Sequence, residues 1–430
     1  TTNGGKKWVS ITNGIPDGTL LWRIVQDHVN PNLLFLGTEY GVYISLDQGE
    51  NWHKFSNGLP TIPVRDIAVQ KRENDLVLAT FGRSFYILDD YSPLRDMTEE
   101  MLSNDGVIFK PRKALQFNQV YGGTSSDGGQ TYYANNPQYG ASITYFVKDA
   151  PASMKSKRVK SEKAKKNGDI PFPGWDALDN ETSEQKNQVI LVVKNKDGEI
   201  VSKISGPLRK GVSRVNWNLT SSIPTTVKAS SRSSRGWRGS GGGIRTQVDP
   251  GVYDLFLNKR VNGVVTEIAG PVELQVEKIR RGTLENPMAE KHEQYYADLA
   301  EFSSKVSEYQ HRFEKANARV STYQRMLMQI TSNIPEASKS LYELTETMSM
   351  LEKKVGGSEA KAEIGEKDFL TISDRLMNAR GGWYPNSYGP TQLHMQSFDI
   401  AKEMFKRVKP EMDAYFENVI RVGKILEEAG

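Results

Sequence analysis

The chain has 430 residues, a formal net charge of +4 at pH 7 and no cysteine. Its length exceeds the roughly 250–300 residues at which a single core stops growing, which predicts several domains. The lack of cysteine excludes disulfides, thiolate metal sites and a cysteine nucleophile. The small net charge gives no overall support to nucleic-acid binding. No apolar run approaches the ~20 residues of a transmembrane helix.

The first predicted elements are two copies of one short turn, Ser/Thr-x-Asp/Asn-x-Gly-x-x-Trp, about 44 residues apart. The Asp or Asn side chain can bond its own turn, the Gly relieves the steric limit on φ, and we expect the Trp to plug the neighbouring strand layer. Repeats of this period are typical of stacked or radial β units. The turn residues are Asn3, Gly5 and Trp8 in the first copy and Ser45, Asp47, Gly49 and Trp52 in the second.

Residues 1–97 are predicted to form two consecutive sets of short strands, which would be one complete and one incomplete blade of a β-propeller. Propellers usually close by pairing a strand from each end of the chain. We therefore expect the missing strand and the other blades to come from sequence upstream of Thr1, a missing N-terminal propeller of the same chain. The predicted strands are 20–28, 33–38, 41–45 and 51–55, and then 64–70, 75–80 and 84–88.

Residues 98–279 are predicted to form a small Ig-like β-sandwich, because short alternating strands are separated by turn signals such as Asp249-Pro250-Gly251. Two insertions interrupt it, and we expect both to be long loops: the lysine-rich segment 153–170 and the Ser/Arg/Gly-rich segment 228–243. The predicted strands are 141–147, 188–194, 211–219, 251–257 and 271–276.

Residues 283–430 are predicted to form an antiparallel bundle of three or four helices, because apolar residues recur at spacings of three and four. Asn286-Pro287 is a suitable helix start, and the glycine pairs at 356–357 and 381–382 are expected breaks. Pro410 lies inside the last apolar pattern and should kink or split that helix. The whole chain is thus expected to be a multidomain β plus α protein.

The two turns resemble the Asp boxes, or BNR repeats, of sialidase-type and sortilin-type β-propellers. The order of propeller, Ig-like sandwich and helical bundle resembles large bacterial proteins labelled glycosyl hydrolase with BNR/sortilin-like repeats. That resemblance implies an exported protein, at the bacterial cell surface, associated with the outer membrane, or extracellular. An Asp box indicates a fold and says little about activity. Stretches 75–90, 136–141, 216–219, 249–253 and 389–391 carry the resemblance.

No catalytic residue, cofactor or metal site is assigned from the sequence. A glycosidase needs two carboxylates across a cleft, and the acids near β structure are Asp47, Asp66, Asp75, Asp89 and Asp90. The five histidines are scattered, and none is spaced i, i+4 from another as in a zinc helix.

Arginine and tryptophan are residue types that anchor interfaces. The candidate contacts for a protein partner are Arg235, Trp237 and Arg238, and the aromatic loop with Trp383 and Tyr384. Packing of that loop under the end of the helical bundle is the alternative. The lysine-rich segment is expected to be solvated, with an acidic partner or anionic lipid headgroups as the alternative. The favoured hypothesis is a non-enzymatic binding or scaffold protein. The alternative is a glycoside hydrolase, with carbohydrate as its ligand and its active site mostly upstream of this chain.

Overall fold

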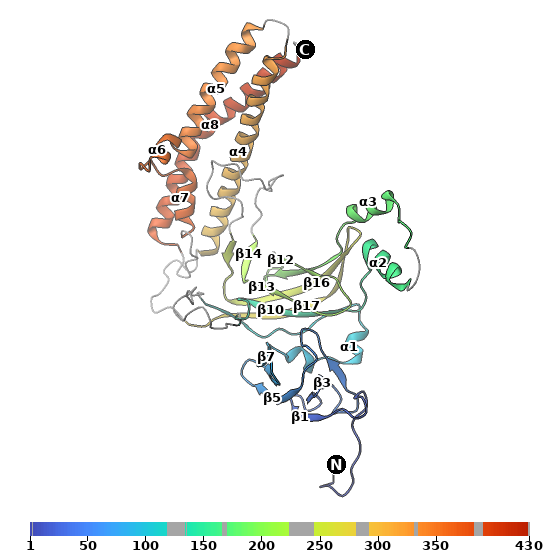
Figure 1. The fold of residues 1–430 in the computed structure, drawn as a ribbon. Coiled ribbons are helices and arrows are strands. Elements are labelled where there is room, and N and C mark those ends of the chain that lie inside the picture. Colours follow the sequence, from blue (N-terminus) through green and yellow to red (C-terminus); the bar gives the residue numbers. More distant parts are fainter. Residues whose placement is uncertain are drawn as a thin grey trace. The chain divides into compact units, whose positions relative to one another are not determined.

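The computed structural model describes residues 1, 3–117, 134, 136–165, 170–222, 245–280, 292–330, 334–381 and 390–428. The chain is a multidomain protein of small sheets and a C-terminal helical region (Figure 1). It divides into two compact units, Thr1–Asn218 with Pro250–Lys278, and Leu219–Asp249 with Ile279–Gly430. The three-part division at residues 97 and 279 stays a prediction.

Two small antiparallel sheets open the first unit, each in sequence order, and they confirm the predicted strands. The third, fifth and sixth strands have the predicted bounds, and the other four are slightly shorter. Their facing sides share one core, built from Phe35, Val42 and Ile44 on one side and Ile67 and Leu76 on the other. The 3-10 helix η1 (Ser92–Arg95) and α1 (Glu99–Ser103) follow. The strands are β1 (Leu21–Gln26), β2 (Leu34–Thr38), β3 (Gly41–Ser45) and β4 (His53–Phe55), then β5 (Val64–Gln70), β6 (Asp75–Thr80) and β7 (Phe85–Leu88).

The same unit contains a three-stranded sheet, β13-β10-β8, and a five-stranded sheet, β12-β11-β16-β17-β9, in which β17 and β9 are parallel. The two sheets meet where the Tyr145 hydroxyl donates to the Pro207 carbonyl at 2.7 Å. The strands are β8 (Gly106–Ile108), β9 (Ala114–Gln116), β10 (Ala141–Val147), β11 (Gln188–Lys194), β12 (Ile200–Pro207), β13 (Gly211–Trp217), β16 (Gly251–Val261) and β17 (Val264–Lys278).

The expected loop over 153–170 is wrong for most of its length. Residues Met154–Ala164 form helix α2, and Trp175–Ser183 form α3. Neither helix contains a buried residue, so no apolar periodicity could reveal them. They are held by polar contacts instead: the Ser153 hydroxyl caps α2, and Arg158 donates to Glu162 and Glu181. The second insertion is flanked by the paired strands β14 (Thr220–Ser222) and β15 (Arg245–Gln247).

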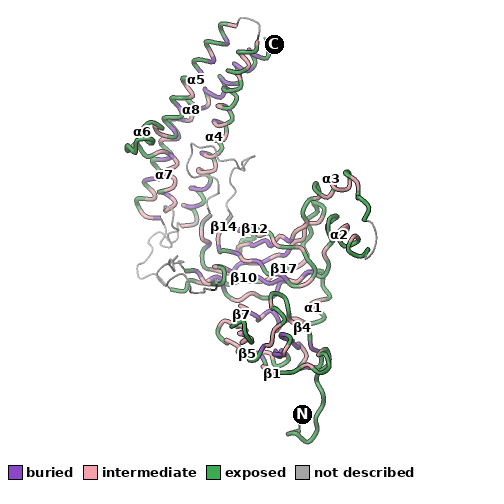
Figure 2. Tube along the Cα trace, in the orientation of Figure 1, coloured by how far each residue is buried: buried purple, intermediate pink, exposed green. Residues whose placement is uncertain are grey.

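The second unit confirms the predicted helical periodicity. Figure 2 shows buried residues along the facing sides of its three long helices. Of the two expected effects of Pro410, the split does not occur, because α8 continues through it; a kink stays a prediction. The proline is exposed, and the buried neighbours Phe405, Val408 and Met412 keep the helix packed on both sides of it. The helices are α4 (His292–Leu327), α5 (Pro335–Gly356), α6 (Glu359–Glu363), α7 (Ile372–Ala379) and α8 (Gln392–Glu428).

Candidate functional site

The predicted turn at Ser45 is a closed network of hydrogen bonds. The Ser45 hydroxyl donates to Asp47 Oδ1 at 2.7 Å and accepts the Gly49 N–H at 2.7 Å. Asp47 Oδ1 also accepts the Asn51 N–H at 2.9 Å. Gly49 has φ of +94°, a conformation that L side chains rarely adopt. These side chains are engaged in holding the turn.

The first copy of the turn has the same bonds. The Thr1 hydroxyl donates to Asn3 Oδ1 at 3.1 Å and accepts the Gly5 N–H at 2.8 Å, and Asn3 Oδ1 accepts the Lys7 N–H at 2.9 Å. Asn can take the place of Asp in these three bonds, because they use one side-chain oxygen, Oδ1. The further bond from Asn51 Nδ2 to Asp47 Oδ2, at 2.8 Å, has no counterpart in the first copy. The assignment of both turns as Asp boxes stays a prediction.

The tryptophans of the two turns differ sharply in how far they are buried. Trp52 is 4% exposed, packs with Leu34, Leu36 and Tyr43, and donates from Nε1 to the carbonyl of Ile11 at 2.7 Å. Trp8 is 76% exposed, so the expectation that both rings plug a strand layer is wrong for the first copy. The turn forms from its own bonds, whereas the Trp is buried only where a sheet lies beside it.

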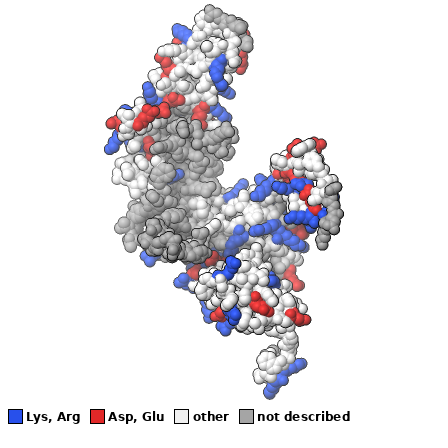
Figure 3. Space-filling model, viewed as in Figure 1, with Lys and Arg blue, Asp and Glu red and all other residues white. Residues whose placement is uncertain are grey.

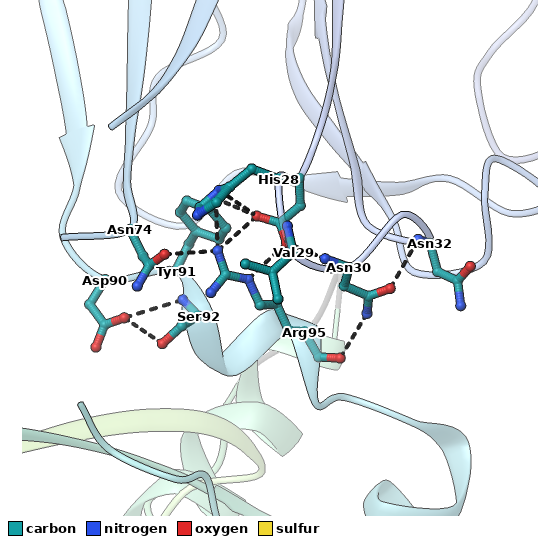
Figure 4. Close-up of polar contacts among 10 residues, drawn as sticks. His28, Val29, Asn30, Asn32, Asn74, Asp90, Tyr91, Ser92 and Arg95 are labelled. Atoms are coloured by element: carbon teal, nitrogen blue, oxygen red, sulfur yellow. Dashed lines mark hydrogen bonds and ion pairs between the residues drawn. The ribbon is translucent and has the colours of Figure 1, made fainter. Parts of the chain in front are cut away.

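A buried polar cluster between the two small sheets was not predicted (Figure 4). Asp27, which follows β1, is fully buried and accepts two bonds of 2.8 Å from Arg95 in η1. The Tyr91 hydroxyl donates to the same carboxylate at 2.5 Å, and Arg95 also donates to Asn74 Oδ1 at 2.8 Å. His28 Nδ1 lies 3.4 Å from Asp27. Since Asp27 and Arg95 satisfy each other, the cluster fastens η1 to the first sheet and offers no free catalytic group.

The cluster should make stability depend on pH in the acid range. Burial acts to raise the pKa of Asp27, but bonds from Arg95, from Tyr91 and from the N–H groups of Asn30 and Val29 outweigh burial and hold that pKa far below its ordinary value. The native state therefore gains stability above the unfolded pKa of about 3.9 and loses it as pH falls below that value.

Urea unfolding at a series of pH values tests this dependence. The free energy that separates the wild type from Asp27→Asn should shrink steadily from about pH 5 to about pH 2. A difference that stays constant across this range would show that the Asp27 carboxylate has an ordinary pKa.

The acids that a glycosidase might use are largely engaged elsewhere. Asp90 accepts from the Ser92 hydroxyl at 2.6 Å, and its N–H donates to Asp75 at 3.0 Å. Arg214 in β13 donates to the carbonyls of Asp89 and Asp90 at 2.7 and 2.6 Å, which ties the second small sheet to β13. Burial and the nearby Asp75 raise the pKa of Asp89. These residues form a joint between sheets.

The most distinctive exposed feature lies on β1 and β5, where each strand carries a β-bulge at an equivalent position. In β1 the pairing jumps from Leu21 to Arg23, and in β5 it jumps from Val64 to Asp66. The extra residues are Trp22 and Arg65. A bulge redirects a side chain, and here the Arg65 guanidinium lies 3.8 Å from the centre of the Trp22 ring and 5.3 Å from that of Phe81.

The residues that follow the two bulges also meet, since Arg23 Nε lies 3.2 Å from Asp66 Oδ1. We call Trp22, Arg23, Arg65, Asp66 and Phe81 the bulge surface. All five are exposed: Trp22 at 37% and Phe81 at 65%. The sequence held one signal of this site, because aligning 20–28 with 64–70 places Trp22 and Arg65 at the same position.

Gly37 sets the spacing behind the bulge surface. A Cβ at Gly37 in β2 would lie 2.5 Å from the carbonyl oxygen of Val64 in β5. Only glycine allows β5 to approach this closely, and Gly37 is also the partner of Arg23 in the β1–β2 register.

Gly37→Ala should therefore lower the free energy of unfolding by about 1–3 kcal/mol, because backbone rather than a side-chain tip blocks the added methyl group. Gly251→Ala in β16 is the matched control, since nothing lies within 4 Å of its Cβ. Chemical denaturation of both variants tests the contact. Equal stabilities would show that the two sheets are not held together at Gly37.

Lysine and arginine side chains gather over α2, and acidic side chains over α3 (Figure 3). An acidic or lipid ligand for α2 stays a prediction. The predicted partner-contact residues Arg235, Trp237, Arg238, Trp383 and Tyr384 lie outside the described residues.

Within the described ranges, no group of three or more His, Asp or Glu is placed to hold a metal ion. Over the same ranges, none of the helices combines the length and apolarity needed to cross a membrane.

The chain matches no protein-family model and no curated protein. Among solved structures it has distant similarity to the extracellular domain of the BT4673 system from B. thetaiotaomicron, described in one structure as a one-component and in another as a hybrid two-component system. The first is 10% identical, covers 60% of this chain and 25% of that chain, and has a TM-score of 0.14. The second is 10% identical, covers 61% and 26%, and has the same TM-score of 0.14.

Proposed function

We propose that this chain belongs to an exported β-propeller protein that acts as a non-enzymatic binding or scaffold component of a protein complex. The equivalent registers and bulges of the two small sheets support the propeller, because repeated blades reuse one local structure. The eight strands β8–β13, β16 and β17 would be its Ig-like sandwich, and α4–α8 its helical bundle. The cell-surface location rests on the sequence resemblance.

The outer side of the second small sheet supports the same proposal. Phe85 and Ile87 in β7 are 67% and 61% exposed, on the side of the sheet opposite the shared core. Among the described residues, β7 pairs only with β6. An exposed apolar edge strand is unfavourable in isolation, so a further blade packed there would bury these side chains.

The bulge surface is the single observation that carries the binding role. An arginine held against two exposed aromatic rings combines the residue types that dominate the energetics of protein interfaces. Four of the five acids near β structure have bonded side chains: Asp47 and Asp90 hold turns, Asp75 accepts from the backbone of Asp90, and Asp66 is paired with Arg23. The site is therefore suited to holding a partner, and we infer binding without turnover.

Selection of random displayed peptides on the full-length protein tests this proposal. Peptides that bind should lose affinity when both Trp22 and Phe81 are changed to alanine, and a polysaccharide panel should show no turnover. Hydrolysis of a polysaccharide by the full-length protein would instead establish the glycoside hydrolase. Binding that is indifferent to the double variant would place the ligand site elsewhere.

A further inference from the structure

We propose that Arg65 recognises a carboxylate on an acidic segment of a protein partner, which deepens the proposed function and depends on it. Arg65 is the extra residue of the β5 bulge, and its guanidinium lies 3.8 Å from the centre of the Trp22 ring and 5.3 Å from that of Phe81. Within the described part of the chain, no hydrogen bond or ion pair occupies its N–H groups. The other cation of the bulge surface, Arg23, is paired with Asp66, so Arg65 is the cation of this described surface that is left for a ligand.

The two rings prepare Arg65 for this role. An aromatic ring that lies over one face of a guanidinium covers that face and leaves the N–H donors at the edge available. A carboxylate binds such an edge through two parallel N–H···O bonds. Because the side chain is already ordered by Trp22 and Phe81, little further conformational entropy is lost on binding.

The surroundings favour a protein over a free small molecule. Leu20 and Leu21 lie next to the bulge and are 49% and 42% exposed, and Trp22 and Phe81 are exposed as well. Small ligands are usually bound in concave pockets that bury most of their surface. Side chains that stand out in this way are covered instead by a broad partner surface, which would exclude water from the Arg65–carboxylate pair.

The test uses peptides selected on the full-length protein for binding that requires Trp22. Their sequences should be enriched in Asp or Glu. Arg65→Gln should weaken their binding by about 10- to 100-fold, and Arg65→Lys should also weaken it because the two-bond geometry is lost. Arg72→Gln is the matched control: it removes the same charge from the β5–β6 turn, where the side chain is 82% exposed, and should leave the affinity unchanged.

The results that would contradict this proposal can be told apart. Peptides that require Trp22 but tolerate Arg65→Gln would overturn the carboxylate contact and leave the proposed function standing. A lack of any Trp22-dependent peptide would overturn the bulge surface as the binding site, and with it the role of Arg65. Free succinate could also displace the peptides completely at a concentration close to the dissociation constants of the peptides. In that case the site would be specific for small carboxylates and not for a protein. Thermal unfolding of the Arg65 variants, expected to match the wild type, confirms that they fold.

Discussion

Arg95→Ala should lower the free energy of unfolding by about 3–5 kcal/mol, because it leaves the Asp27 carboxylate buried without its charged partner. Asp27 is fully buried, and Arg95 supplies two of the bonds that offset this burial. Tyr91 and the backbone N–H groups of Val29 and Asn30 would still donate to Asp27. They carry no charge, so they compensate only in part.

Arg23→Ala is the comparison within the same two sheets. The Arg23–Asp66 pair is 57% and 65% exposed, and pairs of this kind contribute about 0–1 kcal/mol. Urea denaturation at neutral pH measures both variants. If Arg95→Ala lowers the free energy of unfolding no more than Arg23→Ala does, the cluster in Figure 4 does not hold the two sheets together.

Trp52→Ala should also be severely destabilising, by about 3–5 kcal/mol, because it opens a cavity between β2, β3 and the preceding segment. The indole packs on Leu34, Leu36 and Tyr43 and bonds to the Ile11 carbonyl. Trp52→Phe should cost less, since it retains much of the packing and loses the Nε1 bond.

Trp8→Ala provides the matched substitution in the other copy of the turn. Its ring is 76% exposed, so the change should stay within about 0.5 kcal/mol. Thermal or urea unfolding of Trp52→Ala and Trp8→Ala compares the two losses of stability. Equal losses would mean that Trp8 is also buried, against a surface that lies outside the described residues.

The helices and strands could be predicted from the sequence where the spacing of apolar residues and the positions of turn-forming residues indicate the same element. Strands β3, β5, β6, β10 and β11 begin and end where predicted, because Gly, Asn and Asp mark the turns beside alternating apolar residues. The helices α4, α5 and α8 followed from spacings of three and four. The hairpin of α2 and α3 could not be found in this way, because neither helix buries a residue.

The polar sites were harder to predict, since they join residues that are distant along the chain. Nothing local in the sequence links Asp27 to Arg95. The contact between Trp22 and Arg65 depends on two bulges and on the close approach at Gly37. In the two turns, the sequence motif predicted the local hydrogen bonds, and the three bonds named above form in both copies. It did not predict the burial of each Trp, which depends on whether a sheet lies beside the turn.

The dissociation constant of a selected peptide for Trp22→Ala, set beside that for Trp8→Ala, tests the central claim most directly. Both variants lose an exposed indole, but only Trp22 belongs to the bulge surface. We predict a loss of about tenfold or more for Trp22→Ala and no change for Trp8→Ala. Equal affinities for the two variants would contradict the assignment of the bulge surface as the binding site.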